Sequence, residues 1–181
     1  MNEFSTYEYV VKKENKGPQK LKPAFLIIGY IIFALLALAF AVRSRLGAPL
    51  VALAPLALAL IVFLTWRYTK IEYEYSITSG ILTFSEIYGG KSRKTIAEFR
   101  LKDCTAIAPL SDPDKRALAE RYNAEISYIA LSQKDARDAY FATFENEKGK
   151  RCIFFFEATE KALKICRFYN PANTTVTKVS L

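Results

Sequence analysis

AFLIIGYIIFALLALAFAV (residues 24–42) contains no charged side chain, and neither does APLVALAPLALALIVFLTW (residues 48–66). A helix needs about 20 apolar residues to cross the roughly 30 Å hydrocarbon core of a bilayer. Because a charge at the bilayer centre costs on the order of 3 kcal/mol, two runs without any charge are typical of membrane spans. The sequence therefore predicts a transmembrane hairpin, residues 24–66, whose two helices cover residues 24–42 and 48–66.

The basic residues around this hairpin predict its orientation, because the cytoplasmic flanks of membrane spans carry an excess of Lys and Arg. Only Arg43 and Arg45 lie in the turn between the spans, whereas Arg67 and Lys70 follow the second span. Five lysines precede the first span: Lys12, Lys13, Lys16, Lys20 and Lys22. We expect a multi-pass protein of the cell membrane with both termini and the soluble residues in the cytoplasm.

Residues 1–23 are expected to form a flexible, basic juxtamembrane arm, since Gly17-Pro18 and Pro23 interrupt regular structure. Ala39-Phe40-Ala41 resembles a signal-peptidase site, with cleavage after Ala41. The long arm and the second span favour an uncleaved first helix. Residues 171–181 are expected to form a polar tail.

Residues 70–170 have the pattern of a mainly β domain. Ile71–Ile77 alternates apolar and polar side chains, as a half-buried strand requires, and Gly89-Gly90 is a hairpin signal. Runs of this kind predict about seven strands: 71–77, 81–88, 91–101, 104–110, 126–131, 139–145 and 151–157. A domain of this size can bury its own core, so we expect residues 69–181 to fold alone.

A C-terminal helix is expected over residues 160–168, because Thr159 is a helix cap and Asn170-Pro171 a helix stop. The predicted fold class is a membrane α-helical hairpin plus a mainly-β (α+β) domain. In that domain, about seven antiparallel strands form a barrel like that of pleckstrin-homology (PH) domains, closed by the C-terminal helix.

Several stretches carry a resemblance to a family. They are Ile71-Glu72-Tyr73-Glu74-Tyr75 with Thr78-Ser79-Gly80, Lys91-Ser92-Arg93-Lys94, Ala108-Pro109 and Tyr140-Phe141-Ala142. Together with the two spans, they make the chain resemble a family of small two-helix membrane proteins of Gram-positive anaerobes with a C-terminal PH-like domain of unknown function. The resemblance implies the architecture, and it implies no chemistry.

The composition argues against catalysis and against bound metals or cofactors. The chain contains no histidine, and Cys104, Cys152 and Cys166 form no CxxC pair. Base catalysis by imidazole is impossible, and a zinc site would need unusual ligands. Scattered cysteines are more typical of buried side chains in a reducing compartment. We therefore expect no enzyme, no cofactor, no metal, no nucleic-acid partner and no small-molecule substrate.

Three further patterns have ordinary structural interpretations. Gly89-Gly90-Lys91-Ser92 ends like a phosphate-binding loop, but it joins two strands and lacks the earlier glycine, which favours a β-hairpin. Glu72 and Glu74 share a strand face, and without a partner His, Cys or metal motif they are expected to be solvated. The aromatic run Ile153–Phe156 is expected to be a strand buried on both sides.

One basic hairpin has a predicted function. Only about three residues separate Trp66 from the first strand, so that strand leads away from the membrane and the next returns. The following turn would then reach headgroup level, where each basic residue contributes on the order of 1 kcal/mol of attraction to anionic lipid. The predicted membrane-surface contacts are Lys91, Arg93, Lys94, Trp66 and Arg67.

Two functions fit these features. The first is a non-enzymatic, membrane-anchored interaction module whose partners are the lipid bilayer and another protein. The alternative is an accessory subunit or regulator of a transport or cell-envelope complex that acts through its transmembrane helices. Alanines on both spans would permit close helix packing and support the alternative: Ala34, Ala37, Ala41, Ala52, Ala54, Ala57 and Ala59.

The orientation can be tested at Ser44, in the turn between the two spans. A Ser44→Cys variant in which the three native cysteines are alanine should react with a membrane-impermeant thiol reagent on intact cells. The positive-inside rule places this turn outside the cytoplasm. Labelling that occurs only after cell lysis would contradict the orientation.

Overall fold

The computed structural model describes residues 6–12, 21–43, 47–133 and 135–179. They form two compact units. The helical unit lies within residues 15–71 and 88–92, and the β unit lies within residues 1–14, 72–87 and 93–181. The β unit is therefore assembled from three stretches of chain, one of which precedes the helices.

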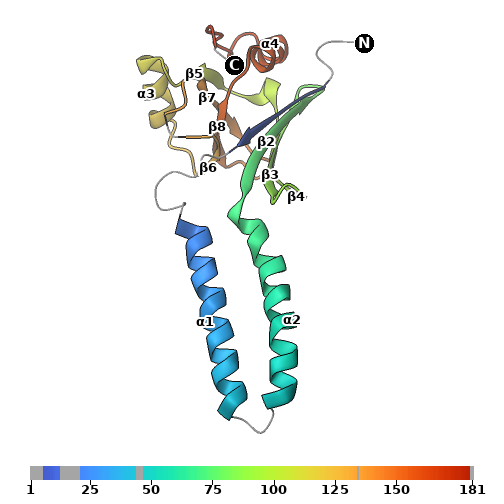
Figure 1. Cartoon of the computed structure of the whole chain (residues 1–181). Coiled ribbons are helices and arrows are strands. Elements are labelled where there is room, and N and C mark those ends of the chain that lie inside the picture. The colour runs from blue at the N-terminus through green and yellow to red at the C-terminus, as the bar shows by residue number, and fades with distance from the viewer. Residues whose placement is uncertain (1–5, 13–20, 44–46, 134, 180–181) are drawn as a thin grey trace. The chain divides into compact units, whose positions relative to one another are not determined.

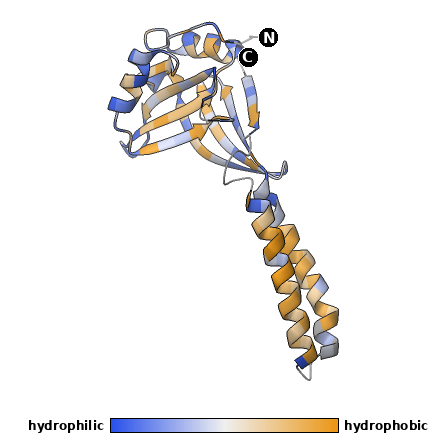
Figure 2. Cartoon of the chain, turned by 60° about the vertical axis from the view of Figure 1, so that its left-hand side comes forward, coloured by the Kyte–Doolittle hydropathy of each residue, from blue (hydrophilic) through white to orange (hydrophobic). Residues whose placement is uncertain are grey.

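The helical unit is a hairpin of α1 (Lys22–Arg43) and α2 (Gly47–Trp66), which lie side by side and antiparallel (Figure 1). Apolar residues cover both helices on all sides (Figure 2), and almost none of them is buried within the chain. A helix that is apolar all round belongs in a protein core or in a membrane. Lys22–Arg43 and Val51–Thr69 are each long and apolar enough to cross a membrane, in agreement with the sequence-based expectation.

The two helices approach each other closely near both ends of the hairpin. The hydroxyl groups of Tyr30 and Thr65 lie 2.5 Å apart, and Thr65 donates onward to the Ile61 carbonyl oxygen at 2.6 Å. Near the turn, a Cβ atom added at Gly47 would lie only 2.6 Å from the Ala41 carbonyl oxygen. Glycine at this position therefore permits the two backbones to approach each other.

The first sheet of the β unit has the strand order β1-β2-β3-β4. Its strands are β1 (Thr6–Lys12), β2 (Ile71–Thr78), β3 (Ile81–Tyr88) and β4 (Ser92–Arg100). β1 pairs with β2 in antiparallel register along its whole length, from Thr6 opposite Thr78 to Lys12 opposite Glu72. These two strands are neighbours in the sheet although both helices lie between them in the sequence.

The second sheet has the order β5-β7-β8-β6. Its strands are β5 (Ala106–Pro109), β6 (Ile126–Ala130), β7 (Ala139–Glu145) and β8 (Arg151–Glu157). β7 pairs antiparallel with β5 and β8, whereas β6 runs parallel to β8. A short helix, α3 (Pro113–Arg121), connects β5 to β6, and a 3-10 turn, η3 (Leu101–Asp103), follows β4.

Aromatic side chains from both sheets form the core of the β unit. The ring centroid of Tyr75 in β2 lies 5.5 Å from that of Phe156 and 6.4 Å from that of Phe154, while Phe84 in β3 lies 5.1 Å from Phe154. None of these four side chains is more than 2% exposed. Fully burying a side chain of this kind stabilises by about 1.5–3 kcal/mol. The predicted burial of the run 153–156 is confirmed for every residue except Phe155, which is half-buried.

A C-terminal helix, α4 (Glu160–Tyr169), is present where the sequence predicted one. Its cap is Thr159, whose hydroxyl accepts the Ala162 N–H at 3.2 Å. Beyond its last turn, the Asn170 side-chain amide donates to the carbonyl oxygens of Leu101 and Cys104 at 2.9 and 2.8 Å. One face of the helix is buried through four side chains: Ala162, Leu163, Ile165 and Cys166.

The residues after α4 are packed against the second sheet. Ile107 of β5 donates its N–H to the Asn173 carbonyl oxygen and accepts the Thr175 N–H, each at 2.8 Å. The hydroxyl groups of Tyr140 and Thr177 lie 2.6 Å apart. The tail expected over residues 171–181 thus contributes backbone and side-chain bonds to the β unit through residue 177.

The expectation of a flexible arm over residues 1–23 is wrong for residues 6–12, which form β1. Tyr7, Tyr9 and Val11 are less exposed than the residues that alternate with them, and Val11 is fully buried. This is the period of two that identifies a strand. The prolines and glycine that indicated flexibility all lie after Lys12, so they do not bear on this segment.

The expectation of one barrel of about seven antiparallel strands is also wrong. The described residues form eight strands in two four-stranded sheets and no closed barrel. β1 adds a strand, and β6 breaks the antiparallel pattern. Parallel neighbours need a long crossover between them. The chain supplies it because all of β7 lies between β6 and β8 in the sequence.

We expect β1 to stabilise the β unit without being essential for its folding. Lys12 and Glu72 are register partners, so a two-residue Asn-Gly turn can replace residues 13–71. This soluble version should unfold cooperatively in urea, followed by circular dichroism. Residues 69–181 alone should be less stable by at least about 3 kcal/mol, because Val11 burial and the strand pairing are lost. Equal unfolding midpoints for the two proteins would show that β1 does not stabilise the β unit.

Candidate functional site

The end of α2 and the turn between β3 and β4 form a cluster within the helical unit. A 3-10 turn, η2 (Arg67–Thr69), leads from α2 towards β2. The Gly89 N–H donates to the Lys70 carbonyl oxygen at 2.9 Å, and the rings of Tyr68 and Tyr88 meet edge to face with centroids 5.5 Å apart. We call this cluster, residues 66–70 with residues 88–91, the junction site.

Two glycines allow the turn to lie against the end of α2. Gly89 and Gly90 have φ angles of +60° and +70°, a backbone conformation that residues with a side chain rarely adopt. A Cβ atom added at Gly89 would lie 3.2 Å from the Cβ of Arg67, so glycine also leaves room for the helix end. The predicted hairpin at Gly89-Gly90 is confirmed, and it brings the exposed Lys91 into the junction site.

The side chains of the junction site have the composition of a membrane–water interface. Trp66 and Tyr68 are exposed. The Arg67 guanidinium lies 4.9 Å from the centre of the Tyr68 ring and donates to its hydroxyl at 2.9 Å. Trp and Tyr are enriched where lipid headgroups begin, and basic side chains are favoured on the cytoplasmic side. This arrangement can hold anionic headgroups.

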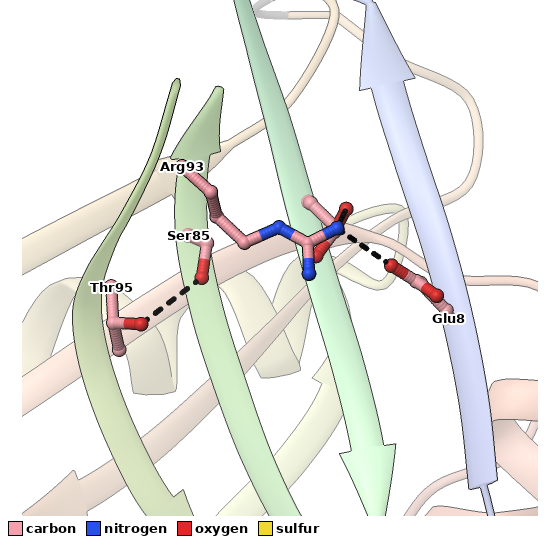
Figure 3. A network of polar contacts seen from close by, with 5 residues as sticks. Glu8, Ser85, Arg93 and Thr95 are labelled. Carbon is pink, nitrogen blue, oxygen red and sulfur yellow. Dashed lines mark hydrogen bonds and ion pairs between the residues drawn. The ribbon is translucent and has the colours of Figure 1, made fainter. Parts of the chain in front are cut away.

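The five predicted surface contacts are divided between the two units. Trp66, Arg67 and Lys91 lie together in the junction site, whereas Arg93 and Lys94 belong to the β unit. Lys94 is exposed. The Arg93 guanidinium instead lies 3.0 Å from a carboxylate oxygen of Glu8 and 2.6 Å from one of Glu74 (Figure 3). Contact of these residues with lipid stays a prediction.

Arg93 forms a network that links three strands, which we call the Arg93 clasp (Arg93, Glu8 and Glu74). It joins β4 to β1 and β2, the strand between β1 and β3 in the sheet. Ser85 and Thr95 lie beside it with their hydroxyl groups 3.5 Å apart (Figure 3). Sequence analysis missed the clasp, since Glu8 lay in the expected arm and Glu74 was expected to be solvated.

Glu74 is only 3% exposed, so the expectation of a solvated carboxylate is wrong for this residue. β1 is the reason, because Val10 of β1 lies directly opposite Glu74 in the register. Burial raises the pKa of Glu74, the neighbouring Glu8 raises it further, and Arg93 opposes both. A buried carboxylate needs such a donor, since one left without a partner costs free energy.

The three cysteines are free and buried, as expected from their spacing. Burial raises the pKa of the Cys166 thiol to about 12 and raises the pKa values of the Cys104 and Cys152 thiols as well. Thiols of this kind are uncharged at neutral pH and are poor nucleophiles. Among the described residues, no group of three or more His, Cys, Asp or Glu side chains could hold a metal ion.

The helical unit also carries an apolar groove of about 310 Å³ between its two helices. Small side chains open it, including Ala34, Ala37 and Ala54 from the predicted alanine-rich faces. The other lining residues are Phe33, Leu38, Val51, Pro55 and Leu58. Small residues at this position leave a surface into which a neighbouring membrane helix can pack.

Comparison with known proteins gives one match. The model of a family described as "Bacterial PH-like domain (DUF6106)" matches residues 3–176. The matched residues include both helices and all eight strands. Neither a curated protein nor a solved structure matches the chain.

We expect the Arg93→Met substitution to destabilise the full chain in detergent by about 1–3 kcal/mol at pH 7, because Glu74 loses its donor. Lys94→Met is the matched control, since Lys94 is the next residue and is exposed. It should change the stability by less than about 0.5 kcal/mol. Urea unfolding followed by the circular dichroism of the sheets measures both, and equal effects would contradict the role of the clasp.

The same clasp predicts a pH dependence. Because its pKa is raised, Glu74 holds a proton more tightly in the folded protein than in the unfolded chain. Its contribution to stability is therefore present below the usual pKa of about 4.5 and is lost as the pH rises through the folded pKa. Relative to a Glu74→Gln variant, the wild type should lose stability from pH 4 to pH 7. A gain in the stability of the wild type relative to the Glu74→Gln variant over this pH range would contradict the raised pKa of Glu74.

Proposed function

Because the chain belongs to the family of bacterial PH-like domains designated DUF6106, we propose that it is a membrane-anchored interaction module without catalytic activity. Helices α1 and α2 fix the protein in the cell membrane. The β unit binds another protein close to the membrane surface. The PH-like fold itself carries no function, so the proposal rests on the sites found in this chain.

The junction site is the observation that carries the proposal. The β3–β4 turn donates a backbone hydrogen bond to Lys70 and packs on Arg67 and Tyr68. The turn is therefore held against the helix end, inside the helical unit, by contacts besides the chain connection. Aromatic rings and cations that are already fixed beside one another lose less entropy when they bind headgroups.

Lipid contact at the junction site supports the same role. Lys91 and Arg67 attract anionic headgroups at on the order of 1 kcal/mol each, and the Trp66 ring is of the type enriched at the membrane interface. The anchor keeps these residues near the bilayer, so even weak attraction is effective. Arg93 contributes mainly through the Arg93 clasp.

Trp66 is the only tryptophan of the chain, so its fluorescence reports the depth of the junction site. In lipid nanodiscs, quenchers near the headgroups should reduce Trp66 emission more than quenchers at the bilayer centre. Stronger quenching from the centre would place α2 at another depth and remove the junction from the membrane surface.

The absence of catalysis and the orientation are part of the proposal. Lack of histidine and the raised pKa values of all three thiols leave few groups that act as bases or nucleophiles near neutral pH. The basic residues before α1 and after α2 favour a cytoplasmic location for the β unit and both termini.

A second candidate function is that of an accessory subunit or regulator of a transport or cell-envelope complex. The apolar groove between α1 and α2 favours it, because a helix of another subunit can pack there. In that case the partner binds the helices, and the β unit is secondary.

Exchange of the anchor separates the two functions. Residues 24–64 are replaced by an unrelated two-helix hairpin, which keeps the junction site intact. Cross-linked partners purified with the wild type should also purify with this variant if the β unit binds them. Loss of the partners would show that they bind through the native helices. A matched control keeps the native helices and replaces Ala34, Ala37 and Ala54 by leucine, which fills the groove.

A further inference from the structure

The exposed face of α4 differs from the rest of the β unit. Phe168 is 62% exposed, which makes it the most exposed large apolar side chain among the described residues outside the two apolar helices. It lies on the face opposite the four buried residues of α4, together with Glu160, Lys161, Lys164 and Arg167. We call these five residues the α4 face.

The α4 face is basic around its one apolar residue. It carries three cations and one carboxylate, and Lys164 lies 2.7 Å from that carboxylate, on Glu160. Residues three and four apart are neighbours on a helix. Phe168 is therefore beside Lys164, and Arg167 is adjacent in sequence. Aromatic and arginine side chains are the residue types most enriched at the centres of protein interfaces.

The α4 face is also held in place by its surroundings. The buried side of α4 is closely packed, with Ala162, Leu163, Ile165 and Cys166 at most 1% exposed. The Phe168 ring meets the Tyr169 ring edge to face at 5.1 Å, and a Cβ atom at Gly80 would touch that Tyr169 ring at 2.6 Å. A surface that is ordered before binding loses less entropy when a partner binds.

We infer that the α4 face is a docking surface for an acidic protein segment that carries an apolar side chain. This inference rests on the proposed function as an interaction module. Carboxylates of the segment face Lys161, Lys164 and Arg167, and its apolar side chain covers Phe168. A membrane is the less suitable partner, because a helix that lies in a bilayer surface needs a whole apolar face. The apolar face of α4 is already buried in the β unit.

The test is an unbiased peptide selection. A random peptide library is selected against the full chain in nanodiscs of zwitterionic lipid. The enriched peptides should be acidic and contain an aromatic or aliphatic residue. Phe168→Ser, and separately the pair Lys164→Glu and Arg167→Glu, should weaken their binding at least tenfold. Because these side chains are exposed, thermal unfolding should change only slightly, even though Lys164→Glu removes the ion pair with Glu160.

Helix α3 supplies the matched control. Leu118 is 46% exposed and Arg121 follows it by three residues, so Leu118→Ser with Arg121→Glu makes the same kind of change on another helix. This variant should keep full peptide binding. Enriched peptides that are neutral or basic, or binding that is equally weakened by the α3 variant, would overturn the inference.

The selection also distinguishes this inference from the proposed function. If acidic peptides are not enriched, and phosphatidylglycerol vesicles bind through Phe168 and Lys164 instead, the α4 face is a membrane contact and the inference is wrong. If the anchor-exchange variant keeps its partners and the α4 variants keep them too, the interaction module stands but its binding surface lies elsewhere.

Discussion

The antiparallel pairing of β1 with β2 is the constraint on which the structure depends. Lys12 and Glu72 face each other in the sheet, and all of α1 and α2 lies between them in the sequence. The sheet therefore closes a loop of chain that contains the apolar helical hairpin. Closure of so long a loop is costly in entropy. The burial of Val11 and the contact of Tyr9 with Tyr75 compensate for part of that cost.

The Arg93 clasp follows from this pairing. Val10 covers Glu74 from the neighbouring strand, and Glu8 brings a second carboxylate beside it. Arg93 can then serve both acids from β4. The same pairing lets the Tyr7 hydroxyl reach Thr159, the cap of α4, at 2.5 Å. One strand thus connects the residues before the apolar helical hairpin to the C-terminal helix of the β unit.

The binding surfaces occupy different parts of the chain. The junction site belongs to the helical unit and combines aromatic rings with cations, which suits lipid headgroups. The α4 face belongs to the β unit and combines cations with one exposed ring, which suits an acidic protein segment. The thiols contribute to neither surface, because all three are buried and protonated. With two such surfaces, the proposed module would join a partner to the membrane.

The sequence by itself determined the apolar helical hairpin, the β-hairpin at Gly89-Gly90 and the capped C-terminal helix, because each depends on residues that are close in the chain. It also placed Trp66, Arg67 and Lys91 together through a count of strand lengths. Only the tertiary structure decided that residues 6–12 form a strand of the distant sheet, that Glu74 is buried and that Arg93 serves two acids. These features depend on the pairing of β1 with β2, whose partners are separated by sixty or more positions, and local patterns carry no information about such partners.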